Sequence, residues 1–396
     1  SSFGIGGTNA HVVLEEAPPA PPGRPSSRSA HLLVLSAATP AALADAVRSM
    51  QQALPSRADP APICAASQLG RSHLACRRAV GVDASGIQAA LREAARGLPA
   101  TPARTRPRVA FLFTGQGSQR AGTGRQLLEQ EPAFAGAFAR CEAVLDPLLG
   151  GSIREVLLED REGRLDRTAF TQPALLALQV ALVELWRSWG VEPDGALGHS
   201  VGEYAAAWCA GAIGLEDALA LVARRAALME SLPEGGAMWS VAAGEDEARA
   251  ALEPEVAIAA VNGPRSVVVS GSAAAVERVA RRLDRSPTRL RVSHAFHSPL
   301  VRPVATALEG LVSSVRLGPP RLPLVSNVSG RLAGEEILRP SYWSRHLLEP
   351  VRFADGLRAL VETGCRALVE IGPRPVLLGL AARVLGPDRC LLLPTL

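Results

Sequence analysis

Residues 198–202 read GHSVG and place Ser200 at the centre of a turn with a glycine at each end. The preceding residues, GALGH, are typical of a short buried strand, and the following residues, EYAAAWCAGA, are typical of a helix. In a G-x-S-x-G turn of this kind the serine hydroxyl is exposed, and the helix N-terminus can stabilise an oxyanion. We therefore predict that Ser200 is a nucleophile and that the amide of Val201 is an oxyanion donor. A purely structural turn is the alternative.

A serine nucleophile needs a general base, and the seven histidines supply the candidates. His199 adjoins the serine and is expected to project away from its hydroxyl. His294 and His297 lie in SHAFHSPL, where the chain is expected to return to the domain of the serine. One of this pair is the predicted base, and a histidine with a structural role is an equal alternative. The other histidines are expected in linker-like or surface segments: His11, His31, His73 and His346.

The sequence leaves open which group orients the base. A hydrolase triad places an acidic residue between the serine and the histidine in chain order. Asp217, Asp246 and Asp284 lie in that interval, but they fall on predicted helices at spacings typical of an exposed face. A Ser-His dyad oriented by a backbone carbonyl is therefore as well supported as a triad.

Two further features indicate how a substrate is held. Arg224 and Arg225 interrupt an apolar helical stretch, LVARRAALM, so one of them is expected to face inward. A buried guanidinium needs an anion, and a carboxylate is its natural partner, so Arg225 predicts a substrate with a free carboxylate. An internal salt bridge is the alternative. Gln116 lies in a GQG turn where hydrolase folds supply a second oxyanion donor, and a simple tight turn is equally possible there.

The composition excludes several classes of protein. The 396 residues are 47% hydrophobic and 20% charged, which is typical of a globular chain of more than one domain. All 42 basic residues are Arg, which excludes a phosphate-loop lysine and a pyridoxal Schiff base. The net charge of +4, without a basic block, argues against nucleic acid. Six scattered cysteines predict neither a metal site nor disulfides, and they suit a cytoplasmic protein.

No membrane partner is expected either. The apolar stretch at 174–186 is interrupted by Gln179 and is too short to span a bilayer. The first residues show no signal-peptide pattern.

The periodicity of the chain predicts α/β architecture. A strand at 11–15 and a Pro-rich linker are expected to precede a small α+β unit at 31–106. The unit that follows is expected to contain a buried strand at 109–113 and a core helix at 172–186. Between 237 and 293 the order βαββαβ predicts a ferredoxin-like unit inserted into the larger one.

Taken together, the motifs resemble a known family over about 107–390. FTGQGSQ, TQPALLALQ, GHSVGE, LVARRAALM, AVNGP, HAFHSP and EIGPRP are similar, in this order, to the acyltransferase domain of modular polyketide synthases and to malonyl-CoA:acyl-carrier-protein transacylases. The resemblance implies an α/β-hydrolase-like large subdomain with a parallel sheet and an inserted small subdomain. It implies that Ser200 is the nucleophile, His297 the base and acid, Arg225 the carboxylate anchor, Gln116 and Val201 the oxyanion hole, and Gln172, His199 and Phe296 the substrate pocket.

The resemblance also implies a domain organisation. It gives a ketosynthase C-terminal tail at 1–18, a linker domain at 19–106, the large acyltransferase subdomain at 107–232 and 294–390, the small subdomain at 233–293 and the start of a following linker at 391–396. The chain is accordingly expected to be a monomeric part of a longer synthase. A ketosynthase domain and an acyl carrier protein are its expected partners.

The implied reaction is ping-pong transfer of malonyl from malonyl-CoA, through an acyl-serine, to the phosphopantetheine thiol of the carrier protein. No bound cofactor or metal is expected. In this family HAFH with a branched residue after the serine goes with malonyl, and Phe296 would fill the space of an α-methyl group; methylmalonyl or another substituted extender is the alternative. A serine hydrolase and a non-catalytic module are rival functions. One departure from the family is Arg374, at a position where the family often has His.

Overall fold

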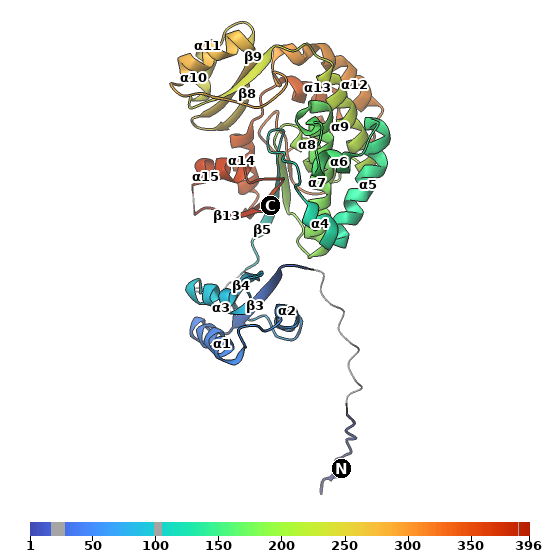
Figure 1. The fold of residues 1–396 in the computed structure, drawn as a ribbon, viewed down its shortest axis with the longest axis vertical. Coiled ribbons are helices and arrows are strands. Elements are labelled where there is room, and N and C mark those ends of the chain that lie inside the picture. The colour runs from blue at the N-terminus through green and yellow to red at the C-terminus, as the bar shows by residue number, and fades with distance from the viewer. Residues whose placement is uncertain (17–27, 99–104, 387) are drawn as a thin grey trace. The chain divides into compact units, whose positions relative to one another are not determined.

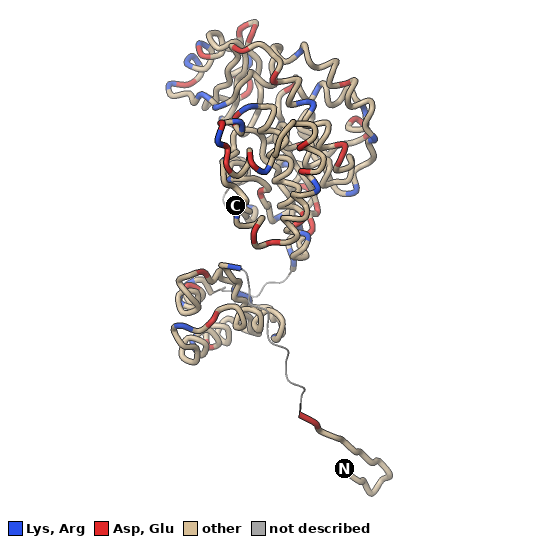
Figure 2. Tube along the Cα trace, turned by 45° about the vertical axis from the view of Figure 1, so that its right-hand side comes forward, with Lys and Arg blue, Asp and Glu red and all other residues tan. Residues whose placement is uncertain are grey.

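The computed structural model describes residues 1–16, 28–98, 105–386 and 388–396 (Figure 1). The chain divides into two compact units, Ser1–Thr105 and Arg106–Leu396. Each unit has a hydrophobic core of its own, and both units carry basic and acidic residues (Figure 2). The Pro-rich linker that the sequence predicts before residue 31, and most of the stretch expected to separate the two units, lie outside the described residues.

In the first unit, two antiparallel strands pack against helices. The elements are β3 (His31–Ala37), α1 (Pro40–Ala53), α2 (Pro60–Leu69), β4 (Cys76–Val82) and α3 (Ile87–Arg96). Helix α1 begins where the sequence favours it, because the hydroxyl of Thr39 accepts the N–H of Ala42 and Pro40 needs no amide partner in the first turn. Alternate residues of β3, such as Leu33 and Leu35, are buried against the helices.

The prediction of a strand at 11–15 is wrong. The structure has instead a small hairpin in which β1 (Ser2–Phe3) pairs with β2 (Asn9–Ala10) around a glycine turn. Residues 11–16 contain three consecutive apolar residues, Val12, Val13 and Leu14, but in the described part of the chain they pair with no strand and are exposed. An apolar segment forms a stable strand only when a neighbouring strand completes its hydrogen bonds.

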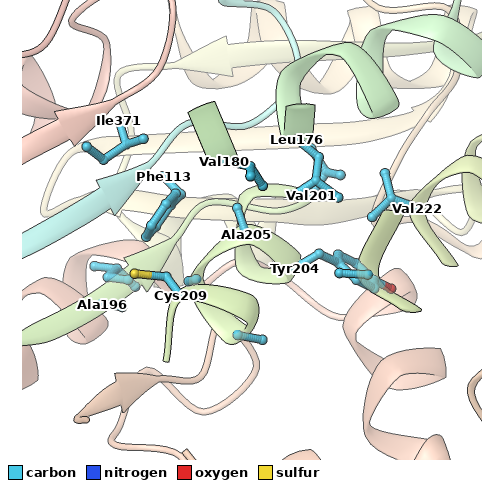
Figure 3. Close-up of a cluster of buried hydrophobic side chains, with 14 of the residues drawn as sticks. Phe113, Leu176, Val180, Ala196, Val201, Tyr204, Ala205, Cys209, Val222 and Ile371 are labelled. Atoms are coloured by element: carbon cyan, nitrogen blue, oxygen red, sulfur yellow. The ribbon is translucent and has the colours of Figure 1, made fainter. Parts of the chain in front are cut away.

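The second unit is built on a five-stranded parallel sheet in the order β11-β6-β5-β12-β13. The strands are β5 (Arg108–Phe113), β6 (Gly195–Gly198), β11 (Leu324–Val325), β12 (Cys365–Ile371) and β13 (Leu391–Pro394). Strand β5 is buried along almost its whole length, as expected for a strand that is covered on both faces. Figure 3 shows part of this core, where Phe113 and Ile371 of the sheet lie beside Val180 and Ala205 of two helices.

Helices surround this sheet and carry several of the candidate residues. They are α4 (Arg125–Gln130), α5 (Pro132–Leu149), α6 (Ile153–Leu158), α7 (Thr168–Ser188), α8 (Gly202–Cys209), α9 (Leu215–Glu230), α12 (Ala305–Ser313), α13 (Pro340–Leu348), α14 (Phe353–Glu362) and α15 (Leu377–Leu385), with short 3₁₀ turns η1 (Arg164–Asp166), η2 (Pro299–Val304) and η3 (Glu335–Leu338).

Helix α7 is a core helix, as predicted, but it is longer than the sequence suggested. Its 21 residues are long and apolar enough to cross a bilayer, so the length argument against a span is wrong for this helix. In the structure, 83% of its most apolar 18-residue window is buried inside the protein. Its hydrophobicity is therefore accounted for by packing in the core.

An antiparallel sheet forms the inserted small subdomain. Its elements follow the predicted order: β7 (Gly236–Val241), α10 (Glu245–Ala250), β8 (Val256–Gly263), β9 (Ser266–Ser272), α11 (Ala273–Leu283) and β10 (Thr288–Arg289). The strand order is β10-β7-β9-β8, and β10 is shorter than predicted. The fold class is thus confirmed: a parallel α/β body with an inserted ferredoxin-like βαββαβ unit, preceded by a small α+β unit.

Candidate active site

Ser200 lies at the turn between β6 and α8 and has a positive φ of 54°. The two glycines of the motif are required by space. A Cβ at Gly198 would lie 2.2 Å from the backbone nitrogen of Glu203, and a Cβ at Gly202 would lie 2.3 Å from the carbonyl oxygen of Phe113. The turn can close this tightly only with glycine at both positions. The local sequence thereby sets the serine at the end of β6, against the end of β5.

His297 is the histidine that meets the serine. Its Nε2 lies 2.7 Å from Ser200 Oγ, and its Nδ1 lies 2.9 Å from the backbone carbonyl oxygen of Glu349. Because a carbonyl can only accept, Nδ1 carries the proton and Nε2 is free to accept the serine proton. The group that orients the base is a backbone carbonyl, and none of the three candidate aspartates is hydrogen-bonded to His297.

The surroundings of His297 keep its imidazole neutral. The side chain is buried, and burial lowers its pKa well below the usual 6.5, with His346 and Arg225 adding repulsion. A neutral imidazole that already touches a serine hydroxyl is arranged to act as a general base.

Arg225 is the inward-facing member of the arginine pair. It is only 2% exposed, whereas Arg224 is exposed. One of its terminal nitrogens donates to the side-chain oxygen of Gln172, its guanidinium carbon lies 5.5 Å from the centre of the Tyr204 ring, and its Nε has no partner. Burial lowers the pKa of Arg225. No carboxylate of the described residues pairs with it, and an anion from outside the chain would neutralise this buried cation.

The turn that carries Gln116 packs against the serine turn. A Cβ at Gly115 would lie 2.7 Å from the carbonyl oxygen of His199, so the two backbones touch there. Within the described residues, neither the amide of Gln116 nor that of Val201 donates to a protein acceptor. Two unengaged N–H groups on adjoining turns can stabilise an oxyanion formed at Ser200.

The recorded contacts of the His199 and Phe296 side chains are with residues other than Ser200. The Nε2 of His199 is 2.9 Å from the side-chain oxygen of Asn262 in β8, and its ring lies 5.5 Å from that of Phe353. Burial lowers the pKa of His199. Phe296 is 6% exposed, with its ring 6.2 Å from that of His294. His199 thus contacts the small subdomain, and its predicted place in a substrate pocket stays a prediction.

Comparison with known proteins agrees with this arrangement. The acyl transferase domain family matches residues 110–395. The chain belongs to this family. A second family, the ketoacyl-synthetase C-terminal extension, matches residues 1–80, ahead of the acyltransferase domain.

Relatives of this acyltransferase domain are parts of much larger proteins. The chain is 45% identical to "Polyketide synthase GfsB" of Streptomyces halstedii, over 98% of this chain and 7% of the relative. Its structure is similar to that of the acyl transferase domain of SpnD in complex with 2-(pent-4-yn-1-yl)malonyl, with a TM-score of 0.84, 34% identity and coverage of 93% and 91% of the two chains. An acyl carrier protein S-malonyltransferase from Vibrio cholerae O1 biovar eltor is 30% identical, with a TM-score of 0.65 over 72% of this chain and 96% of that one.

Two residues of the acyltransferase domain that contact the serine turn, Asn327 and Glu203, were not predicted from the sequence. The side-chain oxygen of Asn327 accepts the N–H of Ser200 at 2.8 Å, and its side-chain nitrogen donates to the carbonyl of Gly198 at 2.8 Å. The carboxylate of Glu203, fully buried, accepts the backbone N–H of Asn327 and the hydroxyl of Tyr342. The available signal was a glutamate placed next to the second glycine of the motif in an apolar helix.

The expectation that His346 lies at the surface is wrong. It is 1% exposed, and its Nε2 lies 3.0 Å from the Glu203 carboxylate. Its ring is 6.1 Å from the ring of His297. The misleading feature was the charged segment SYWSRHLLEP, in which α13 buries one face and exposes Arg345 on the other. His346 is therefore a buried histidine that lies close to the Ser200–His297 pair.

Arg374, the departure from the family pattern, supports the Gln116 turn. Its guanidinium donates to the carbonyl oxygens of Ser118 at 3.2 Å and Gly117 at 3.3 Å. The residue is exposed and makes no hydrogen bond with the dyad. Among the described residues of the acyltransferase domain there is also no group of three His, Cys, Asp or Glu side chains that could hold a metal ion.

Proposed function

We propose that this acyltransferase domain transfers an extender unit, malonyl in particular, from malonyl-CoA to the phosphopantetheine thiol of an acyl carrier protein. The observation that carries the proposal is Arg225, a buried guanidinium without an anionic partner in the same unit as the Ser200–His297 pair. A carboxylate on the acyl group would neutralise this cation. An acyl group without a charge would leave the cation unpaired. The same requirement argues against a simple esterase.

The proposed chemistry is two acyl transfers at one serine. Ser200 Oγ attacks the thioester carbonyl while its proton passes to His297 Nε2, and the oxyanion is held by the amides of Gln116 and Val201. The C–S bond then breaks and CoA leaves with the proton from His297. The phosphopantetheine thiol next gives its proton to His297 and attacks the acyl-serine, and Ser200 regains its proton as it leaves. Arg225 would hold the distal carboxylate throughout.

The same proposal covers the setting of the domain. Relatives such as the polyketide synthase of Streptomyces halstedii are far longer than this chain, and the extension that matches residues 1–80 belongs to ketoacyl synthetases. We therefore assign residues 1–18 to a ketosynthase tail and 19–106 to the linker that follows it. The large subdomain comprises 107–232 and 294–390, the small subdomain 233–293, and 391–396 begin the next linker. The working environment is the cytoplasm, and the separate chain is a monomer.

Intact-protein mass spectrometry tests the function directly. The chain is mixed briefly with malonyl-CoA, methylmalonyl-CoA and acetyl-CoA in competition, with Ser200→Ala as the control. We expect a malonyl adduct on the wild type and none on the variant. Rapid release of CoA without an adduct would favour a hydrolase, and the absence of both adduct and release would overturn acyl transfer as the function of this chain.

Phe296 underlies the proposed preference for malonyl. Its ring is buried beside His294, one residue before His297. Replacing it by serine removes the bulk that would exclude an α-methyl group, so Phe296→Ser should raise methylmalonyl loading relative to malonyl by about tenfold, the usual scale for a steric difference of this size. The ratio of the two adducts in the competition experiment measures it. An unchanged ratio would count against Phe296 as the determinant and leave the methylmalonyl alternative open.

A further inference from the structure

A continuous series of side-chain hydrogen bonds leads from Arg225 to the backbone where α9 ends. Its members, in order from the guanidinium, are Gln172, Gln116, Thr168, Ser293 and His294, and it ends on the carbonyl of Leu232. We call it the Arg225–Leu232 series. It joins four separate segments: α9, α7, the turn after β5 and the stretch that leaves the small subdomain.

The contacts of the series are side chain to side chain except at its last step. Gln172 Nε2 lies 3.5 Å from Gln116 Oε1, and Gln116 Nε2 lies 3.2 Å from Thr168 Oγ1. Thr168 Oγ1 lies 2.6 Å from Ser293 Oγ, which lies 2.9 Å from His294 Nδ1. His294 Nε2 then lies 3.1 Å from the carbonyl oxygen of Leu232. Thr168 is fully buried, His294 is 6% exposed and Ser293 is exposed.

The two ends give the series a single direction. A carbonyl can only accept, so His294 donates from Nε2, and in the neutral ring its Nδ1 accepts. Ser293 must then donate to His294, and Thr168 must donate to Ser293. A guanidinium can only donate, so at the other end Gln172 presents its oxygen to Arg225 and its nitrogen to Gln116. Each glutamine amide therefore has one orientation in which every hydrogen bond of the Arg225–Leu232 series joins a donor to an acceptor.

We propose that Thr168, Ser293 and His294 are positioning residues that hold Gln116 and Gln172 in this orientation and thereby present Arg225 to the carboxylate of the acyl group. The proposal rests on the proposed function, in which a carboxylate is the ligand of Arg225. Without the Thr168 hydroxyl, the Gln116 amide loses the acceptor of its N–H group. Either amide is then free to turn, and a turned Gln172 sets its donor against the guanidinium.

Thr168→Val, a near-isosteric change, tests the series, and Thr168→Ser is the matched variant that keeps a hydroxyl. Second-order rate constants for Ser200 acylation are measured with malonyl-CoA and with acetyl-CoA. We expect Thr168→Val to lower the malonyl rate constant about five- to tenfold, the scale of one lost buried hydrogen bond, and to leave the acetyl rate constant within about twofold. Thr168→Ser should restore the malonyl value. Arg225→Ala is the reference for complete loss of the malonyl preference.

Thr171→Val controls for a hydroxyl lost from the same helix. Thr171 lies one turn further along α7 and donates to the backbone carbonyl of Leu165, outside the series. Any effect of this variant should change both substrates alike. If Thr168→Val also lowers malonyl and acetyl loading in parallel, or if Thr168→Ser does not restore selectivity, the positioning role is overturned while the acyltransferase function stands.

Binding of free malonate gives a readout that does not depend on turnover. Calorimetry on Ser200→Ala, with and without Thr168→Val, should show weaker malonate binding in the double variant by about five- to tenfold. Equal affinities would overturn the positioning role. Malonate binding that depends on Thr168, without any acylation of the wild type, would support the positioning role and overturn the proposed function. If the protein neither binds malonate nor is acylated, the positioning role and the proposed function are both overturned.

Discussion

Ser200 and His297 share an uncommon backbone conformation. Their φ angles are 54° and 55°, and only one other described non-glycine residue, Asp160, has a positive φ. Such conformations cost about 1–3 kcal/mol each and persist where the surroundings impose them. At Ser200 the surroundings include the side chain of Asn327, which contacts the backbone on both sides of the turn. At His297 they include the carbonyl of Glu349.

The lowered pKa of His297 predicts how acylation depends on pH. The base must be neutral, and its pKa is well below the usual 6.5, so acylation of Ser200 should stay at full rate as pH falls through 6.5 and decline only at lower pH. Single-turnover rates of adduct formation across pH measure this limb. A midpoint at or above 6.5 would contradict a buried neutral imidazole in the free enzyme.

Asn327→Ala should slow acylation by about ten- to hundredfold, because the strained serine turn loses the side chain that fixes it. The loss should fall on the single-turnover rate constant at saturating malonyl-CoA and leave KM nearly unchanged. Asn9→Ala, an exposed asparagine in the first unit, is the matched control. An unchanged rate constant alongside a lower melting temperature would reduce Asn327 to a structural role.

Helix α15 begins on a buried carboxylate. Both oxygens of Glu370, which is 1% exposed, accept backbone N–H groups from Val376, Leu377 and Leu378 at 2.7–2.8 Å. These are amides of the first turn of the helix, where negative charge is favourable. Glu370 thus ties the end of β12 to the start of α15, close to the turn that contains Arg374.

Glu370→Ala should therefore lower the free energy of unfolding of the second unit by about 2–4 kcal/mol, since it leaves buried amides without an acceptor. Chemical denaturation measures the change. Glu362→Ala, at the exposed end of α14, should stay within about 0.5 kcal/mol of the wild type. Equal values for the two variants would contradict the capping role.

Local signals predicted most of these elements and part of the site. Strong periodicity located β5, α7 and the βαββαβ order, and glycine spacing located Ser200. The packing role of Gln179, which interrupts the apolar stretch at 174–186, was not predicted. Its nitrogen donates to the carbonyls of Thr114 and Ile371, so it joins the ends of β5 and β12. Such contacts join residues 65 and 192 positions apart, and no local pattern encodes them.

The rest of the site was not predicted for the same reason. Asn327 and His346 contact Glu203, from which each is separated by more than a hundred residues in the sequence. The short strand β11, which leads to Asn327, has two residues and little periodicity. At 11–15 the opposite error occurred, because a run of β-branched and apolar residues was present without a partner strand.

Considered as a whole, the chain has two units with separate cores, and all the candidate catalytic residues lie in the second. Residues 106–396 expressed alone should therefore fold and acylate Ser200 within about twofold of the rate of the complete chain. Circular dichroism and the single-turnover assay check the two parts of this prediction. A folded fragment with a much lower rate would show that the first unit contributes to the site.

The chain enters and leaves the inserted subdomain at one place. The Nε2 of His294 lies 3.1 Å from the carbonyl oxygen of Leu232, and a Cβ at Gly236 would lie 2.8 Å from the backbone nitrogen of Ala295. Because the two crossings lie this close together, the gap that the insert leaves in the large subdomain is one that a short turn could bridge, at a small entropic cost. In genetic terms the insert is therefore one continuous cassette of chain, and its exchange for that of a relative has to keep the backbone hydrogen bonds that Ala259 and Val261 make with Val351 of the surrounding body.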